Sequence, residues 1–238
     1  MQEPKHDKEK MNFQVERFVF FSDGVFAISI TLLIIELKVP VLDNPNDHLL
    51  GHYLSLMALR FLGFVISFGI VGHYWSVHHR IFGYAQKYTT QLLWINLGFL
   101  FTVVTLPFSS ALLGEYSSHT DMYIPYAIYA INMVLTGVMN YWLWKYISNP
   151  KRHMLTRKIS SARIKIGLYR SLVIPIIFII SLIVSFIFPI TSRILLLLIP
   201  IILHWGMVGL EKKVEKEETA AFKIISDNKV HSGEGVNQ

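Results

Sequence analysis

The sequence predicts an all-α membrane protein with six transmembrane helices. Of its 238 residues 53% are hydrophobic and only 16% are charged, and the mean hydropathy is +0.44, whereas soluble domains carry about 25% charged residues. A series of apolar runs each approaches the ~20 residues that a helix needs to cross a bilayer. Lysine and arginine gather in a few segments between these runs. That distribution is typical of topology determinants and argues against nucleic acid as a partner, despite a net charge of +6.

The first three spans follow from apolar runs separated by turn sequences. The first covers residues 18–39, and residues 41–53 are expected to form a loop because they contain the turn-forming sequence Asp-Asn-Pro. The second span, 56–80, contains three glycines that allow helices to approach closely. The third, 92–113, contains Pro107, which removes one backbone hydrogen bond and predicts a kink.

The second half of the chain predicts three further spans. They cover residues 122–145, 168–188 and 191–210, and Pro175 lies inside the fifth. The connection over 189–193 is so short that the fifth and sixth spans must form an antiparallel hairpin.

The distribution of basic residues predicts the orientation. Most lysines and arginines lie before the first span, between spans two and three, in residues 145–170 and after span six. The opposite side holds only Lys38 and Arg193, with Arg60 near the outer end of span two. By the positive-inside rule both termini are cytoplasmic, and the even number of spans agrees. We therefore expect a transmembrane channel domain over 1–210 and a charged cytoplasmic tail over 211–238.

The basic segment over residues 145–170 permits two interpretations. It sets topology as a cytoplasmic loop, which charge counting favours. Alternatively it forms an interfacial amphipathic helix that binds anionic lipids.

The first span is unusual because it carries ionisable residues in an apolar run. Arg17, Asp23 and Glu36 lie within or beside it. Such groups cost several kcal/mol or more at membrane depth and persist when they are paired or face water. This helix is therefore the leading candidate for a functional site.

Helical periodicity separates two faces of this span. At about 100° per residue one apolar stripe forms, and it contains Gly24, Ile28, Thr31, Leu32 and Ile35. Ser22 and Asp23 project away from it. The stripe is expected to line an axis or to pack against neighbours, and periodicity alone favours ordinary packing. The polar face needs partners on other helices of the same subunit, since an unpaired Asp23 would be costly.

Candidate partners lie where span two ends and span three begins. His78, His79 and Asn96, with His73 and Trp75 beside them in sequence, reach the same predicted membrane depth as Ser22 and Asp23. A buried hydrogen-bond network is favoured over direct contact with ions, because these groups point off the stripe.

Other chemistry is disfavoured. The histidines lack the spacing of three or four residues that places two metal ligands on one helical face, so no metal site is predicted. No catalytic motif, nucleotide-binding loop or potassium-filter sequence is present, and we predict neither an enzyme nor a cofactor. The role of Glu36 remains open between two alternatives. Its carboxylate attracts cations at a pore mouth, or it pairs with Lys38 or extends to the lipid headgroups.

The start of the chain resembles a known family. The motif Arg-x-x-x-Phe-Ser-Asp runs from Arg17 to Asp23 and continues into Gly-Val-Phe-Ala-Ile. This resembles the signature of the transmembrane protein 175 family of potassium channels. The similarity extends to the end of span two, residues 75–82, and to Leu-Pro-Phe at 106–108. It covers roughly the first half of the chain, and the second half agrees mainly in the number of spans.

The resemblance implies an assembly and roles for individual residues. Bacterial members are six-helix subunits that form homotetramers, with the first helix lining the pore and bulky apolar layers constricting it. By position these layers are Ile28, Leu32 and Ile35, with Thr31 beside them. A structural network is implied for Arg17, Phe21, Ser22, Asp23, His78, His79 and Asn96.

Together these points predict a modestly selective channel for K⁺ in a bacterial cell membrane. A proton- or cation-coupled secondary transporter that uses Asp23 and the histidines is the alternative. It is less favoured because the sequence predicts no span that is interrupted near the midplane, and no inverted repeat is evident.

Overall fold

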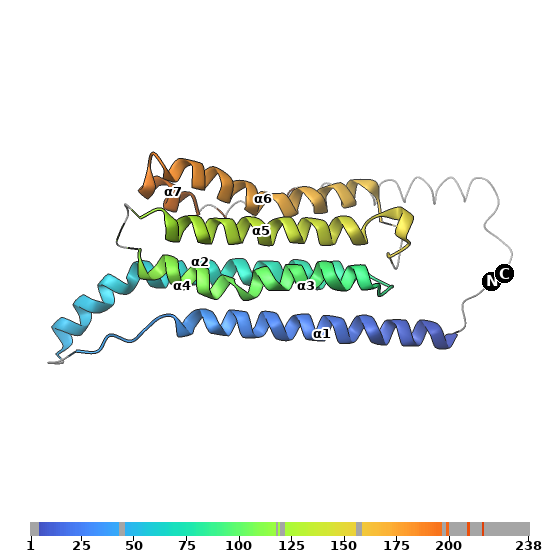
Figure 1. The fold of residues 1–238 in the computed structure, drawn as a ribbon, viewed down its shortest axis with the longest axis horizontal. Helices are drawn as coiled ribbons and strands as arrows, with labels where there is room; N and C mark the ends of the chain where they lie inside the picture. The colour runs from blue at the N-terminus through green and yellow to red at the C-terminus, as the bar shows by residue number, and fades with distance from the viewer. Residues whose placement is uncertain are drawn as a thin grey trace.

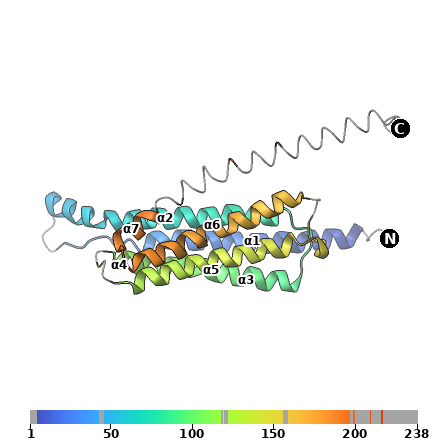
Figure 2. The same cartoon turned by 90° about the horizontal axis from the view of Figure 1, so that it is seen from above.

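The protein folds into an elongated helical bundle. The computed structural model describes residues 5–42, 46–117, 119, 122–155, 159–196, 199, 209 and 216. The helices run along one long axis in both views (Figure 1, Figure 2). They are α1 (Lys5–Ile35), α2 (Asp47–Phe82), α3 (Thr90–Val104), α4 (Leu106–Glu115), α5 (Ile124–Ile147), α6 (Ser161–Ser185) and α7 (Pro189–Leu196), with a short 3₁₀ turn, η1 (Pro150–Arg152).

The packing order places α1 at one edge and α5 in the interior. Helix α1 packs on α2, α3 and α4, whereas α5 contacts α3, α4 and α6, and α7 packs on α6. Figure 1 shows this order, with α1 along one side of the bundle and α5, α6 and α7 along the other. A helix at the edge of one subunit is available to meet copies of itself.

An all-helical, multi-pass membrane protein is confirmed. Four stretches are long and apolar enough to cross a bilayer: Phe13–Ile35, Asp47–Phe82, Thr90–Glu115 and Ser161–Ser185. Helix α5 corresponds to the predicted fourth span and is 24 residues long, and Asn132, Thr136 and Asn140 lie on its buried face. Of the predicted sixth span only 191–196, 199 and 209 are among the described residues. The count of six therefore stays a prediction.

Local capping moved three predicted boundaries. The loop expected over 41–53 ends earlier, because Asn46 caps α2 by accepting the backbone N–H of Leu49 at 2.8 Å. Helix α6 starts at Ser161, seven residues before the predicted span, behind the N-cap Ser160. The expected connection over 189–193 is wrong, because Pro189 opens α7; proline is favoured at a first helical position.

The third span is divided at the single residue Thr105 but remains one stretch, Thr90–Glu115, which agrees with the predicted kink at Pro107. Helix α3 ends at Val104 and α4 begins at Leu106, so Pro107 occupies the first turn of α4. The Thr105 hydroxyl lies 2.9 Å from the Thr102 carbonyl oxygen and 3.3 Å from Oδ1 of Asn132 on α5. Asn132 also donates from Nδ2 to Ser109 Oγ at 3.0 Å. The polar groups at this bend therefore find partners within the same chain.

The segment after α5 is tied to the loop between α2 and α3. Gln86 donates its backbone N–H to the Met154 carbonyl at 2.9 Å, and Ala85 forms a β-bridge with Leu155. The guanidinium of Arg152 lies 4.0 Å above the Tyr146 ring. In the described part of residues 145–170 the chain is thus the end of α5, the turn η1 and the start of α6, and no separate amphipathic helix occurs there.

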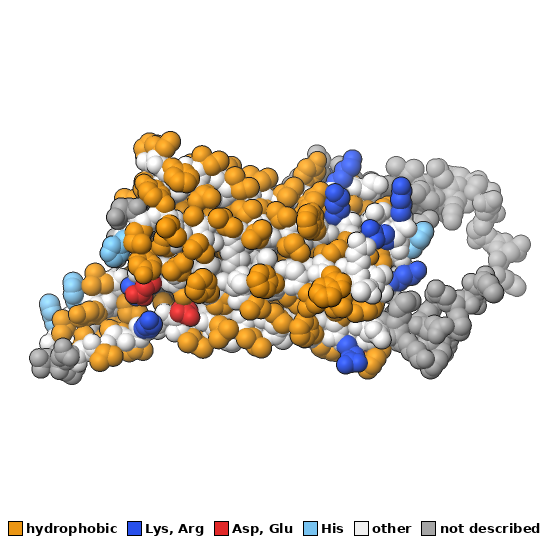
Figure 3. Space-filling model, viewed as in Figure 1, with side chains coloured by type: hydrophobic (Ala, Val, Ile, Leu, Met, Phe, Trp, Pro, Cys, Tyr) orange, Lys and Arg blue, Asp and Glu red, His pale blue; other side chains and the backbone are white. Residues whose placement is uncertain are grey.

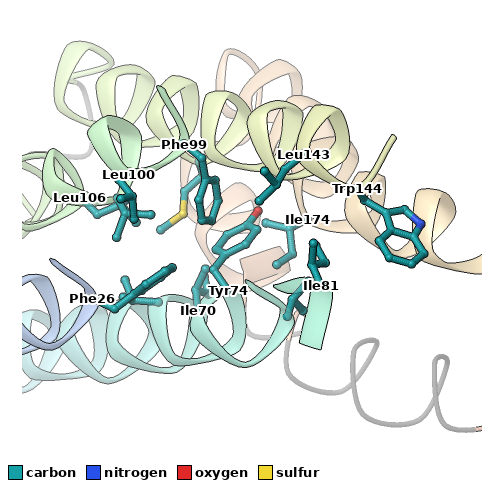
Figure 4. Close-up of a cluster of buried hydrophobic side chains, with 14 of the residues drawn as sticks. Phe26, Ile70, Tyr74, Ile81, Phe99, Leu100, Leu106, Leu143, Trp144 and Ile174 are labelled. Atoms are coloured by element: carbon teal, nitrogen blue, oxygen red, sulfur yellow. The ribbon is translucent and has the colours of Figure 1, made fainter. Parts of the chain in front are cut away.

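The apolar core lies between α2, α3, α5 and α6. Figure 4 shows Ile70, Tyr74 and Ile81 of α2 facing Phe99 of α3 and Leu143 of α5. The Tyr74 and Phe99 rings meet edge to face with centroids 6.2 Å apart, an arrangement that aromatic pairs prefer.

Close contact between α5 and α6 depends on glycine. A Cβ added at Gly137 would lie 2.5 Å from the Pro175 ring of α6, and one added at Gly167 would strike the Trp144 ring. The close approach predicted at the glycines of the second span is not seen in the described structure, since a Cβ added at Gly63, Gly69 or Gly72 meets nothing within 4 Å. Small residues instead allow α5 and α6 to approach closely.

We expect Gly137→Ala to lower the free energy of unfolding by about 1–3 kcal/mol, because the rigid Pro175 ring leaves no room for a methyl group. The measurement is thermal unfolding in detergent. Gly69→Ala is the matched control: its added Cβ meets nothing within 4 Å, so the gain in helix propensity of about 0.5–1 kcal/mol should stabilise the protein. Equal effects of the two substitutions would contradict the close-contact interpretation.

Candidate functional site

One face of α1 is buried against the rest of the bundle. Its buried side chains recur at intervals of three or four residues, as on one face of a helix: Phe18, Ser22, Phe26, Ser29 and Leu33. This face contacts α2, α3 and α4. Two of its five members are serines, so it carries polar groups where no bulk water can satisfy them.

A chain of hydrogen bonds joins three helices at this face. His78 of α2 lies with Nε2 2.8 Å from Oδ1 of Asn96 on α3. Asn96 donates from Nδ2 to Ser22 Oγ at 2.9 Å, and Ser22 donates to the Phe18 carbonyl at 3.0 Å. Since an amide oxygen only accepts, His78 carries its proton on Nε2. All bonds run in one direction, from α2 to the backbone of α1.

Aromatic rings surround this chain. His78 stacks on Phe99 with centroids 5.6 Å apart and a 7° interplanar angle, and lies 4.5 Å from the Phe82 ring. Phe26 and Phe18 of α1 flank Ser22 and contact Phe99 and Phe82 respectively. His78, Asn96 and Ser22 are fully buried. The rings exclude water, so each hydrogen bond is strong and costly to lose.

Asp23 forms a separate contact. Its Oδ1 accepts the indole N–H of Trp75 at 2.9 Å. His79 stands one turn further along α2, with its ring 6.0 Å from that of Trp75, and is exposed. Asp23 is therefore linked to Trp75, whereas His78 bonds to Asn96.

The opposite face of α1 is left uncovered by the described residues. Ile28 is 62% exposed, Ile35 67% and Leu32 39%, and Thr31 is also exposed. The Thr31 hydroxyl lies 2.9 Å from the Ile28 carbonyl and 3.0 Å from that of Ala27. Because its hydrogen is directed to its own helix, the hydroxyl presents its oxygen lone pair outward.

The remaining sequence candidates lie outside the network. Arg17 is exposed on α1 and its guanidinium lies 5.8 Å from the Phe13 ring centroid, on the stripe side where the helical wheel places it. Phe21 is 54% exposed. Glu36 is exposed at the other end of α1, and within the described residues it makes no ion pair with Lys38. The structure thus brings together Ser22, Asn96 and His78 but leaves Arg17, Phe21 and Glu36 apart from them.

Two groups of polar contacts, one around Ser67 and one between Arg60 and Glu115, were not anticipated from the sequence. Ser67 of α2 lies 2.8 Å from Ser110 Oγ of α4 and 3.0 Å from the Tyr129 hydroxyl of α5. Arg60 and Glu115 form a salt bridge of 3.2 Å between α2 and α4. The sequence shows these residues as isolated polar positions in apolar spans. Which of them contact one another depends on how the helices pack, which the sequence pattern does not give. Over the described residues no group of three or more potential metal ligands is found.

Removal of Asn96 tests the hydrogen-bond chain. We expect Asn96→Leu and Ser22→Ala each to lower the free energy of unfolding by about 1–3 kcal/mol per orphaned buried group. The double variant should lose less than the sum by about 0.5–3 kcal/mol, because both substitutions break the same bond. Thermal or chemical unfolding in detergent gives the three values.

Ser29→Ala is the matched control for this cycle. Ser29 is buried on the same face but bonds only to the Val25 carbonyl of its own helix, at 2.9 Å. Its effect should add to that of Asn96→Leu. Additive losses for Ser22→Ala with Asn96→Leu would refute the coupling.

Comparisons with known proteins agree with these features. A sequence model of the family described as the endosomal/lysosomal potassium channel TMEM175 matches residues 17–107. Potassium channel B446_29190 of Streptomyces collinus is 36% identical over 129 residues, which cover 54% of this chain and 62% of that protein. Potassium channel Cha6605_3372 of Chamaesiphon minutus is 35% identical over 138 residues, 57% of this chain and 67% of that protein. The matched region thus spans about two thirds of these relatives.

The fold agrees over a longer stretch. The crystal structure of a lysosomal potassium-selective channel TMEM175 homologue from Chamaesiphon minutus matches with a TM-score of 0.68 and 27% identity, covering 82% of this chain and 98% of that one. The region that the family model matches, residues 17–107, contains the Arg-x-x-x-Phe-Ser-Asp motif of α1 together with His78 and Asn96. The chain belongs to the TMEM175 family.

Proposed function

We propose that this protein is a potassium-permeable cation channel whose pore is lined by α1. The two bacterial relatives above are named potassium channels, and the matched crystal structure is described as a homologue of a potassium-selective channel. These names support the class of function. The structure contributes a physical argument for the part played by α1.

The observation that carries the proposal is the division of α1 into an anchored and an uncovered face. Ser22 holds one face through Asn96, and the aromatic rings beside it prevent rotation of the helix. The other face leaves Ile28 and Ile35 largely exposed and Leu32 partly exposed. A fixed helix that exposes a regular row of bulky apolar side chains is suited to form the wall of a narrow path.

Such a wall needs several copies of the chain. Helix α1 lies at the edge of the subunit (Figure 1), so one copy does not surround a path with this face. A homotetramer with α1 helices around a central axis places four equivalent layers of Ile28, Leu32 and Ile35 toward the axis. In a bacterial cell membrane with both termini in the cytoplasm, Glu36 then lies near the outer mouth, where acidic groups attract cations.

An apolar constriction sets the conduction properties. Narrow apolar segments gate by dewetting, and an ion that passes them gives up part of its hydration shell. K⁺ loses water at lower cost than Na⁺, so modest selectivity follows without a carbonyl cage. The outward lone pair of Thr31 replaces part of the lost hydration beside the apolar layers.

The transporter alternative is less well supported. An interrupted helix is a feature of many transporters, and α3 and α4 are interrupted at Thr105. However, Thr105, Asn132 and Ser109 bond to one another or to nearby backbone inside the subunit. This arrangement leaves the interruption as a structural feature, and the relatives are named channels.

Recording from planar bilayers tests the proposal. With KCl on one side and equal NaCl on the other, purified protein should give a steady current that reverses toward the K⁺ equilibrium potential. Silence from protein that is folded and inserted would refute channel function. Flux that requires a coupled proton gradient would favour the transporter.

Ile28→Asn should raise basal conductance and weaken the preference for K⁺, because an amide in the constriction opposes dewetting. Single-channel and reversal-potential measurements give both values. Ile34→Asn is the control, since Ile34 is also exposed, at 48%, but lies about 120° away from Ile28 around the helix. If Ile28→Asn behaves as the unaltered protein does, Ile28 does not form a constriction.

Thr31→Val should move the reversal potential toward zero with little change in side-chain volume, because it removes the oxygen that replaces ion hydration. Thr31→Ser keeps the hydroxyl and should retain the selectivity. The bi-ionic reversal potential distinguishes the two variants. The same shift in both would assign the effect to the methyl group instead.

A further inference from the structure

A cavity of about 280 Å³ lies toward the end of the bundle where α2 and α5 end and α6 begins. Its lining includes Val77 of α2, Trp144 of α5, and Gly167 and Ser171 of α6. Figure 3 shows that Lys and Arg side chains gather at this end of the bundle, whereas hydrophobic side chains cover its length. The cavity takes no part in the proposed conduction path, which uses the exposed face of α1.

Two buried polar atoms of the interior have no hydrogen-bond partner among the described residues. They are the hydroxyl oxygen of Tyr74 on α2 and Oδ1 of Asn140 on α5. The two residues are 2% and 1% exposed. Nearly all buried polar groups in proteins bond to the protein or to ordered water. Two such atoms in one region therefore indicate a ligand that bonds to both.

Helical spacing places both atoms one turn inward from the cavity. Tyr74 precedes Val77 by three residues and Asn140 precedes Trp144 by four, so each lies on the cavity-lining face of its helix. Asn140 also donates from Nδ2 to Ser171 Oγ at 3.1 Å, and Ser171 itself lines the cavity. The Asn140 side chain thus lies at the inner end of the cavity.

The Tyr74 hydroxyl is directed to the same place. Figure 4 shows it pointing away from α2, toward Leu143 of α5 and Ile174 of α6. Leu143 lies one turn after Asn140, and Ile174 lies one turn after Ser171. Because Asn140 and Ser171 bond across these antiparallel helices, the hydroxyl reaches α5 and α6 at the level of their hydrogen bond.

The hydrogen-bonding capacity at this point matches one water molecule. Asn140 Oδ1 only accepts, whereas the Tyr74 hydroxyl has a proton to donate. Ser171 Oγ donates to the Gly167 carbonyl at 2.9 Å and accepts from Asn140, which leaves it one lone pair. One donor and two acceptors complement the lone pairs and the two protons of water, and buried waters typically make about three hydrogen bonds.

The cavity gives water room and a mixed lining. A water needs only about 10–15 Å³ of such volume. Arg80, Arg163 and Arg170 also line the cavity, but they are already engaged in contacts within the protein, so their charges identify no ionic ligand. We infer that the inner end of the cavity binds an ordered water molecule, which accepts a hydrogen bond from Tyr74 and donates to Asn140 and Ser171. This water joins α2 to the pair formed by α5 and α6.

Tyr74→Phe tests the water bridge without any recording of current, so its outcome is independent of the channel proposal. We expect the thermal unfolding midpoint in detergent to fall by about 2–4 °C, because the variant loses one hydrogen bond of a buried network. A hydroxyl with no partner predicts the opposite result, since its removal ends the cost of burying it. An unchanged or raised midpoint would therefore overturn the inference.

Two other tyrosines are the matched controls. Tyr129 is as buried as Tyr74 but its hydroxyl lies 3.0 Å from Ser67 Oγ, so Tyr129→Phe shows the loss for a hydroxyl with a partner. Tyr169 is 69% exposed, and Tyr169→Phe should leave the midpoint unchanged. Tyr74→Phe should resemble Tyr129→Phe.

An experimental map of the unaltered protein that resolves ordered water distinguishes a bridge from a direct bond. We expect density for one water within about 2.5–3.2 Å of both the Tyr74 hydroxyl and Asn140 Oδ1. Direct contact between these two atoms would overturn the inference, as would empty space between well-resolved side chains. The map decides alone if Tyr74→Phe does not fold.

Discussion

Ser22 accepts a hydrogen bond from Asn96, and the rest of the arrangement around α1 depends on this contact. Hydrocarbon offers no water to an unpaired amide or imidazole, so polar groups at this depth must bond to one another. Nε2 of His78, Asn96 and Ser22 bond in a single chain across three helices, whereas Nδ1 of His78 is buried with no hydrogen-bond partner in the described structure. This contact fixes the rotation of α1 about its own axis. Because Ser22 faces Asn96, the face that carries Ile28 and Ile35 points away from the rest of the bundle.

The same requirement organises the interior of the bundle, where α5 plays the central part. Asn132 spans the interruption between α3 and α4, Tyr129 meets Ser67 of α2, and Asn140 bonds to Ser171 of α6. These contacts connect polar residues on the buried face of α5 to the helices around it. Steric contact completes the packing, since Gly137 admits the Pro175 ring of α6. Helix α5 thus connects the other helices of the chain, whereas α1 lies at the edge of the bundle.

The proposed function depends on the face of α1 that the rest of the bundle leaves exposed. The proposed conduction path uses side chains that the subunit leaves uncovered, so its geometry is completed by assembly. The cavity lined by Val77, Trp144 and Gly167 is different, because its described lining comes from α2, the turn after α2, α5 and α6 of one chain. The proposed constriction and this cavity are therefore built from different helices of the chain.

Sequence patterns were sufficient for the helical class, the apolar stripe of α1 and the depth at which Ser22, His78 and Asn96 lie, because hydrophobicity, periodicity and span order are properties of the chain itself. Their roles in conduction remain predictions. Boundaries were less predictable: the caps at Asn46 and Ser160 act through local side-chain bonds that hydropathy does not register.

Only the tertiary structure decided which polar residues pair. Asp23 contacts Trp75 instead of His78, Asn132 fills the interruption at Thr105, and Arg80 joins Arg163 and Arg170 around one cavity. The sequence by itself determined which faces of the helices are polar and which are apolar. Which faces meet depends on how the helices pack beside one another, and that is set by close contacts between residues as far apart in the sequence as Ser22 and Asn96.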